Sequence, residues 1–132
     1  MGVHLEIITP KGTILSCEAE YVSVPGAEGV FGVLPGHIPF LSALAVNALH
    51  YETQEQTRYV FISGGIAEVL DNNVAILAES AEEAENIDFA RAEAARNRAE
   101  ARLARKDEVV NETRAQAALC RAVRRLDLRG RL

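Results

Sequence analysis

Residues 58–77 read RYVFISGGIAEVLDNNVAIL, and this stretch decides what the first part of the chain folds into. Two apolar runs, residues 66–70 and 74–77, flank Asp71-Asn72-Asn73. Asn and Asp tolerate positive φ angles, so the triplet predicts the short loop of a β-hairpin. Another strand is expected at residues 58–62. The intervening Ser63-Gly64-Gly65 predicts a strand bend and not a nucleophile elbow, because no helix follows it.

Strand patterns continue toward the N-terminus. Val3, Leu5 and Ile7 alternate with polar residues, which is the period of a half-buried strand. Residues 9–12, TPKG, supply a turn, and residues 21–24 and 46–51 are further β-rich segments. Short strands separated by frequent turns predict an antiparallel sandwich or barrel.

A glycine-rich stretch, VPGAEGVFGVLPGHIP at residues 24–39, has the composition of a phosphate-binding loop. Such a loop needs a helix N-terminus after it, and here more β-like sequence follows. The glycine spacing matches no common nucleotide-binding pattern. We therefore expect tight turns, with Pro25-Gly26 and Pro35-Gly36 as the turn elements.

His37 is the one histidine in this stretch, and no obvious nucleophile or acid partner accompanies it. A structural or interface role is favoured over catalysis, and a small enzyme centred on His37 would need a pocket with a second titratable group. Cys17 and Cys120 have neither disulfide nor metal-ligand spacing, so a reducing cytoplasm and no metal are expected.

The net charge of −5 is divided unequally along the chain. Residues 1–80 carry −7, whereas residues 81–132 carry +2 and are rich in Ala, Arg and Glu. The composition thus predicts a boundary near residues 78–85. No apolar run reaches the roughly 18 to 20 residues of a membrane span, and the N-terminus lacks signal-peptide character, so no membrane insertion is expected.

The C-terminal part predicts two helices. Asp88 is a good N-cap, and residues 89–106 contain no Gly, Pro or β-branched residue. Helix propensity falls at residues 107–111, and a second helix is expected at residues 112–126. If the chain folds back near residue 108, Ala94 would face Ala122 and Ala101 would face Ala115 in a narrow seam of small residues.

The same register brings Arg91, Arg98, Arg121 and Arg125 to one side of the helix pair. One interpretation is a solvated face whose arginines pair with nearby glutamates. The other is a site where an anion or a partner protein determines the conformation, because an alanine seam buries little apolar area and clustered like charges repel. The residues alone leave both open.

Two blocks together resemble a known family. VPGAEGVFGVLPGHIPFLSAL and FISGGIAEVLDNNVAILAESAEEAENID, followed by the Ala/Arg/Glu-rich tail, are similar to the epsilon subunit of the bacterial-type rotary ATP synthase over essentially the whole chain. The resemblance implies an α+β protein. An N-terminal antiparallel β-sandwich would occupy residues 1–84, and a two-helix antiparallel hairpin residues 85–132.

The resemblance also implies a regulatory ATP site, with or without magnesium. Many bacterial members carry Ile/Leu-Asp-x-x-Arg-Ala at the start of the first helix, and residues 87–92, IDFARA, match it. Asp88 would then hydrogen-bond the nucleoside, Ile87 and Ala92 would pack on the base, and Arg91 would reach phosphate. The complete implied set is Glu82, Ile87, Asp88, Arg91, Ala92, Arg98, Arg121 and Arg125.

The implied role is regulatory and mechanical, without catalysis and without nucleic acid. The sandwich would bind the gamma subunit and the c-subunit ring at the cytoplasmic face of the bacterial plasma membrane, through Glu28, Gly29, Val30 and His37. The helices would extend among the alpha and beta subunits and block ATP hydrolysis through Arg114, Arg121, Arg124 and Arg125. The alternative is a standalone β-sandwich binding module with a dispensable helical tail.

Overall fold

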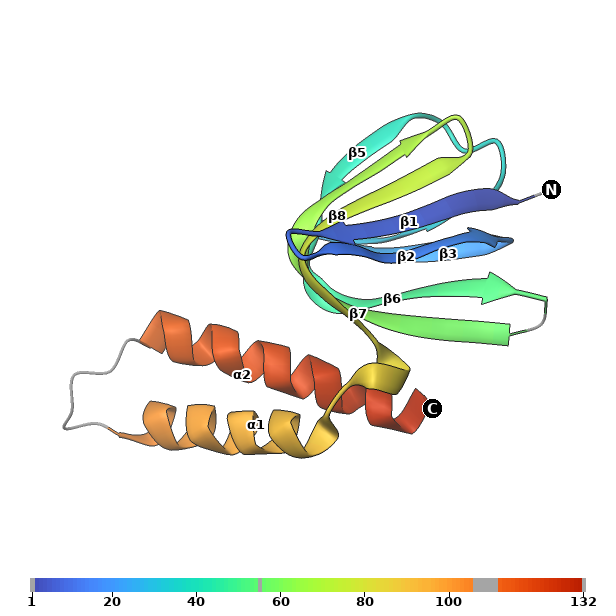
Figure 1. Cartoon of the computed structure of the whole chain (residues 1–132). Coiled ribbons are helices and arrows are strands. Elements are labelled where there is room, and N and C mark those ends of the chain that lie inside the picture. Colours follow the sequence, from blue (N-terminus) through green and yellow to red (C-terminus); the bar gives the residue numbers. More distant parts are fainter. Residues whose placement is uncertain (1, 55, 106–111, 132) are drawn as a thin grey trace.

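The computed structural model describes residues 2–54, 56–105 and 112–131, and shows a body of strands followed by a pair of helices (Figure 1). In these residues the strands are β1 Val3–Thr9, β2 Gly12–Ala19, β3 Tyr21–Gly26, β4 Gly29–Val33, β5 Phe40–Ala43, β6 Val46–Thr53, β7 Gln56–Leu70 and β8 Asn73–Glu83. Their order in the sheet is β2-β1-β8-β7-β6-β3-β4, with β5 paired to β7 beside this path. The predicted β-sandwich followed by a helix pair is confirmed.

Strand β7 is long enough to take part in both layers of the sandwich. Its first part pairs with β6 up to Ser63, and its last part pairs with β5 from Ile66 onward. Gly64 and Gly65 lie between the two parts with φ angles of +71° and +120°. A Cβ on Gly65 would collide with the Leu77 carbonyl oxygen of β8, so glycine is required there. The predicted bend is confirmed. The two strands expected on either side of it, residues 58–62 and 66–70, form the single strand β7.

The turn between β7 and β8 contains two residues, Asp71 and Asn72, with φ angles of 49° and 62°. Two successive positive φ angles are those of a type I′ hairpin turn, so the predicted hairpin is confirmed. The Asn72 side chain also accepts a hydrogen bond from the Gly36 N–H at 2.7 Å. This contact ties the predicted Pro35-Gly36 turn, where the Gly36 φ angle is +84°, to the hairpin.

The expected turn at Pro25-Gly26 was wrong. Both residues belong to β3, where Pro25 pairs with Val30 and Gly26 with Gly29, and the turn falls at residues 27–28. Pro25 lies beyond Ser23, where the pairing of β3 with β6 ends. Because Pro25 pairs with β4 but no longer with β6, its missing N–H removes no hydrogen bond from the β3–β6 ladder. Strands β4 and β5 were not predicted, because glycines interrupt the first and the second is short.

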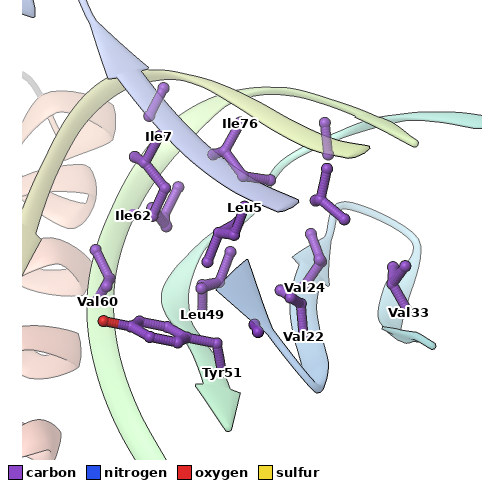
Figure 2. Packing of buried hydrophobic residues seen from close by; sticks show 14 of the residues in the cluster. Leu5, Ile7, Val22, Val24, Val33, Leu49, Tyr51, Val60, Ile62 and Ile76 are labelled. Atoms are coloured by element: carbon purple, nitrogen blue, oxygen red, sulfur yellow. The ribbon is translucent and has the colours of Figure 1, made fainter. Parts of the chain in front are cut away.

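One strand pair departs from the predicted antiparallel arrangement. Strands β1 and β8 run parallel, with Leu5 opposite Val74 and Ile7 opposite Ile76. The inward residues of β1 alternate as expected, and Figure 2 shows them among side chains from β3, β6, β7 and β8. Leu5, Ile7 and Ile76 are fully buried, so this parallel pair lies in the centre of the main core.

The two helices are α1 Phe89–Ala104 and α2 Glu112–Asp127, with the short 3-10 helices η1 Ala84–Asn86 and η2 Leu128–Arg131 at the junctions with the sandwich and the C-terminus. They lie side by side, and α2 is the helix nearer the strands (Figure 1). Helix α1 ends at Ala104, and Arg105, which was expected to be helical, is its C-cap residue. The predicted break at residues 107–111, and position 106 before it, are not among the described residues.

The predicted register of the helix pair was wrong on the α1 side. Ala92 and Ala99 are 4% and 2% exposed and form the seam, whereas the expected Ala94 and Ala101 are exposed. On α2 the expected Ala115 and Ala122 are buried. Alanines occupy several faces of α1, so composition alone did not distinguish them. The seam is made of small residues, as predicted, but on α1 these residues lie two positions before the expected ones.

Candidate functional site

The start of α1 is held by Asp88. Its backbone is extended, with φ −81° and ψ 94°, and its Oδ1 accepts a hydrogen bond from the Arg91 N–H at 3.0 Å. This is the predicted N-cap, and it satisfies one of the four backbone donors that a helix start leaves unpaired. Asp88 therefore orients the first turn of α1, which carries most of the predicted ATP motif.

A second apolar cluster joins the helices to the sandwich. Phe61 of β7, Ala84, Ile87 and Leu128 are its buried members, and Phe89 packs against them. Ile87 is 7% exposed here, and Ala92 is buried in the helix seam. Both side chains that the family motif assigns to a nucleobase therefore already have protein contacts in this arrangement.

Arg125 links α2 to the sandwich through two contacts. Its Nε donates a hydrogen bond to Glu82 Oε1 at 2.7 Å, and its guanidinium carbon lies 4.4 Å from the centre of the Phe61 ring. The side chains of Arg125 and Glu82 are 25% and 36% exposed, so the ion pair is partly desolvated. The structure thus brings together two members of the predicted ATP set that lie 43 residues apart in the sequence.

Three further arginines of that set have guanidinium groups without a partner among the described residues. Within the part of the chain that the structure describes, the side chains of Arg91, Arg98 and Arg121 make no hydrogen bond or ion pair. Each precedes a seam alanine by one position, namely Ala92, Ala99 and Ala122. One position is a rotation of about 100° around a helix. In an antiparallel pair such positions fall along the same edge, which carries an unbalanced positive charge.

The four predicted rotor-contact residues do not form one cluster. Glu28 lies in the turn before β4, and Val30, near the start of β4, is 68% exposed. His37 lies in the loop beyond the other end of this five-residue strand. Its Nδ1 is 2.6 Å from the Ile38 carbonyl oxygen, and its ring lies 6.2 Å from that of Phe40. Glu28, Gly29 and Val30 share the hairpin, and His37 is separate.

An exposed apolar face on β5, β7 and β8 was missed by the sequence reasoning. Ile66 lies opposite Leu77 on one side and Ala43 on the other, and in the next row Leu41 lies opposite the exposed Glu68. Leu41, Ile66 and Leu77 are 67%, 48% and 50% exposed. The signal was present, because apolar residues occupy both alternating sets of positions along residues 66–70, so a strand buried on one face still presents an apolar second face.

Neither a metal-binding group nor a membrane-spanning helix is found among the described residues. Among them, no group of three or more His, Cys, Asp or Glu side chains is arranged to bind a metal ion. No helix in the described ranges combines the length and hydropathy needed to span a bilayer.

Comparisons with known proteins agree over both parts of the chain. The profile of the family described as ATP synthase, Delta/Epsilon chain, beta-sandwich domain matches residues 2–84, and that of its long alpha-helix domain matches residues 85–129. The ATP synthase epsilon chain of Nitratidesulfovibrio vulgaris strain DP4 is 58% identical, over 98% of this chain and 96% of the relative. That of Syntrophobacter fumaroxidans is 56% identical, over 94% and 92%.

Solved structures show the same fold. A chain of the Euglena gracilis mitochondrial ATP synthase superposes with a TM-score of 0.80 at 28% identity, covering 92% of this chain and 78% of the other. A chain of the Tetrahymena thermophila mitochondrial ATP synthase central stalk and c-ring has a TM-score of 0.61 at 11% identity, covering 96% of each, and supports the fold alone.

A β-sandwich followed by a two-helix pair, matched by both family profiles, defines a subunit of a rotary ATP synthase and not an enzyme in its own right. The chain belongs to the ATP synthase delta/epsilon family, among its bacterial epsilon chains. It is accordingly a non-catalytic subunit.

Proposed function

We propose that the chain is a rotor subunit of the central stalk, in which the sandwich joins the c-subunit ring to the gamma subunit at the cytoplasmic face of the plasma membrane. The exposed apolar face of β5, β7 and β8 is the observation that carries the proposal. Leu41, Ile66 and Leu77 expose about half or more of their surface on neighbouring strands, which is typical of a surface that another protein covers. We assign this face to the gamma subunit.

The gamma assignment is tested by Ile66→Asp, which places a charge in the centre of the apolar face. We expect at least a tenfold loss of affinity for the gamma subunit in a pull-down or calorimetric titration, with an unchanged melting temperature. Leu34→Asp is the control, because Leu34 is 59% exposed but lies in a loop outside these strands. Equal loss in both variants, or none in Ile66→Asp, would exclude this face as the gamma contact. Copurification with gamma would itself argue against a standalone module.

The c-ring contact is proposed for the tip of the β3–β4 hairpin, Glu28 to Val30, with His37 as a separate contact. Val30 offers an apolar side chain at that tip, where it is largely exposed. Cysteine placed at residue 30 should form crosslinks to the c-ring in the assembled complex, and cysteine at residue 37 should crosslink independently of it.

We further propose that the two helices, residues 85–132, inhibit ATP hydrolysis when they leave the sandwich and extend among the alpha and beta subunits. Two of the implied inhibitory arginines are engaged in the docked form, since Arg125 contacts Glu82 and Phe61, and Arg124 lies 3.8 Å from Asp127. The Arg124 contact lies within α2 and is independent of docking, whereas the Arg125 guanidinium cannot contact Glu82 and another subunit at the same time, so docking and inhibition compete for Arg125. Deleting residues 85–132 should raise ATP hydrolysis by the complex while leaving rotation coupled, and unchanged hydrolysis would falsify an inhibitory tail.

ATP gating of that transition is proposed from the arginine-rich edge of the helix pair. Arg91, Arg98 and Arg121 have no described side-chain partner, so the phosphates of ATP would neutralise repulsion that otherwise weakens the docked form. Calorimetric titration of the isolated chain with ATP, with and without magnesium, tests this. Arg91→Ala should weaken binding at least tenfold, whereas Arg102→Ala, an arginine of α1 outside the motif, should not. Undetectable binding by the unmodified chain would remove the ATP gate but leave the inhibitory role standing.

A further inference from the structure

A groove of about 500 Å³ lies where the C-terminal end of the chain meets the sandwich. Its sandwich side is built from β3, β4, β6 and β7, and its other side from the end of α2 and from η2. This is a separate place from the arginine-rich edge, because none of Arg91, Arg98, Arg121 and Arg125 lines it. The lining residues are Ser23, Val30, Asn47, Ala48, His50, Tyr59, Arg124, Asp127, Leu128 and Arg131.

The helical side of the groove is cationic. Arg124 and Arg131 contribute two guanidinium groups, and Asp127 is the single carboxylate among the described residues of the lining. Asp127 lies 3.8 Å from Arg124, a loose contact between half-exposed side chains. The described contact of Arg131 is with the Tyr59 ring, whose centre is 5.7 Å from the guanidinium carbon. The described lining residues therefore carry more positive than negative charge.

The sandwich side adds hydrogen-bond donors. Ser23 is only 5% exposed, and its hydroxyl has no partner among the described residues. The side-chain Oδ1 of Asn47 accepts a hydrogen bond from the Ala48 N–H at 2.8 Å, so the side-chain nitrogen Nδ2 of Asn47 remains as the group that can donate to a ligand. None of the described side chains has a buried polar atom without a hydrogen-bond partner, so the Ser23 hydroxyl is open to solvent and can donate to a ligand in the groove.

The third element of the groove is a pair of rings. His50 and Tyr59 lie opposite each other on β6 and β7, with ring centres 5.4 Å apart and planes inclined by 41°. Together with Ala48 and Leu128 they give the groove a partly apolar, planar wall. Its volume lies within the range of small-molecule sites and is much larger than a bare inorganic anion requires.

We propose that this groove binds a small organic anion that carries a phosphate or carboxylate group on a planar ring. The anionic group contacts Arg124 and Arg131, the ring lies against Tyr59 and His50, and Ser23 and Asn47 donate to its remaining oxygens. Because the two sides of the groove come from different domains, only the docked arrangement contains the complete site. A bound anion therefore favours the docked helices, and it does so whether or not ATP binds at the other edge.

Phenyl phosphate is the probe, titrated into the full-length chain and followed by backbone and side-chain amide chemical shifts. We expect saturable shifts at Ser23, Asn47, His50 and Tyr59, and an affinity at least fivefold higher than that of inorganic phosphate. Shifts concentrated at Arg91 and Arg98, equal affinities for the two probes, or no saturation would each overturn the proposal.

Variants separate this site from general attraction to arginine. Arg124→Gln combined with Arg131→Gln should lower the affinity for phenyl phosphate at least tenfold. Arg129→Gln is the matched control, because Arg129 belongs to the same short helix but lies against Phe89 and Glu93 outside the groove. Arg91→Gln should leave phenyl phosphate binding unchanged. If Arg129→Gln weakens binding as much as the double substitution does, the groove is not the site.

Discussion

Individual residues with unusual environments determine several local features of this chain. Gly65 and Gly12 have nearly the same φ angle, +120° and +126°. They differ in their surroundings, because a Cβ on Gly65 meets the backbone of β8 and one on Gly12 meets nothing within 4 Å. Making the same substitution at both glycines therefore separates the free-energy cost of an unfavourable φ angle from the free-energy cost of a steric collision.

Gly65→Ala should therefore be more destabilising than Gly12→Ala. The positive φ angle costs about 1 to 3 kcal/mol in each variant. The collision with β8 adds about 2 kcal/mol or more in Gly65→Ala alone. Urea denaturation followed by circular dichroism measures the difference, and equal destabilisation of the two variants would contradict the importance of the close approach between the bend and β8.

The two cysteines should differ in reactivity. Cys120 is exposed on α2, whereas Cys17 packs partly against the core of the sandwich. Burial raises the pKa of the Cys17 thiol, and the nearby Glu18 and Glu83 carboxylates raise it further. A raised pKa leaves less of the reactive thiolate at a given pH. At pH 8 we expect iodoacetamide to modify Cys120 at least tenfold faster, as measured by mass spectrometry. Cys120→Ser should retain only the slow phase, and unfolding should abolish the difference.

At the scale of elements, the attachment of α2 to the sandwich depends on a few contacts near its C-terminus. Arg125 contacts Glu82 and Phe61, and Leu128 is buried beside Phe61. Farther from the sandwich the helices rely on a seam of alanines, which buries less apolar area per residue than leucine would. The attachment is therefore concentrated in one short region and can be removed by single substitutions.

The Arg125–Glu82 pair should show a measurable coupling energy. A double-mutant cycle with Arg125→Ala and Glu82→Ala is expected to give about 1 kcal/mol, because the pair is partly buried and its geometry is short and direct. The Arg129–Glu93 pair is the comparison, at 3.7 Å with side chains 54% and 50% exposed, and should give less than about 0.5 kcal/mol. Chemical denaturation supplies both values, and a larger coupling in the exposed pair would contradict this account.

Sequence reasoning predicted those elements whose signals are local. The residue types of Asp71-Asn72 favour a tight turn, and Asp88 favours a helix start. The alternating apolar residues of β1 favour a strand with one buried face. The failures depend on distant partners. The register of α1 could not be determined because its alanines lie on several faces, and the parallel pairing of β1 with β8 has no local signal. For the candidate site, the sequence placed Arg125 near Glu82 only through family resemblance, and it gave no indication of the groove beside Tyr59.

The whole molecule consists of a sandwich with a large apolar core and a helix pair with a small one. The main core contains the fully buried Leu5, Leu49 and Ile62, whereas the seam between the helices is made of alanines. Conformational stability is distributed according to such differences in buried contacts. The two parts should therefore open independently.

Hydrogen exchange should show this independence. Amides of β1, β7 and β8 are expected to exchange at least a hundredfold more slowly than amides of α1 and α2, because the helices can leave the sandwich without unfolding it. Exchange measured by mass spectrometry on the full chain tests the prediction. Equal protection of both parts would mean that the helices unfold only together with the sandwich.

The parallel pairing of β1 with β8 also bears on the order in which the chain can fold during synthesis. Strand β1 is made first, yet Ile7 finds its partner Ile76 only after most of the sandwich has been translated. Contacts of such large sequence separation form slowly, since a long loop must close before they are made. During synthesis, the β1–β2 hairpin therefore exposes the edge of β1 until β8 has been translated. The helices follow immediately after β8, so they emerge as the sandwich closes and dock on a surface that has only just been completed.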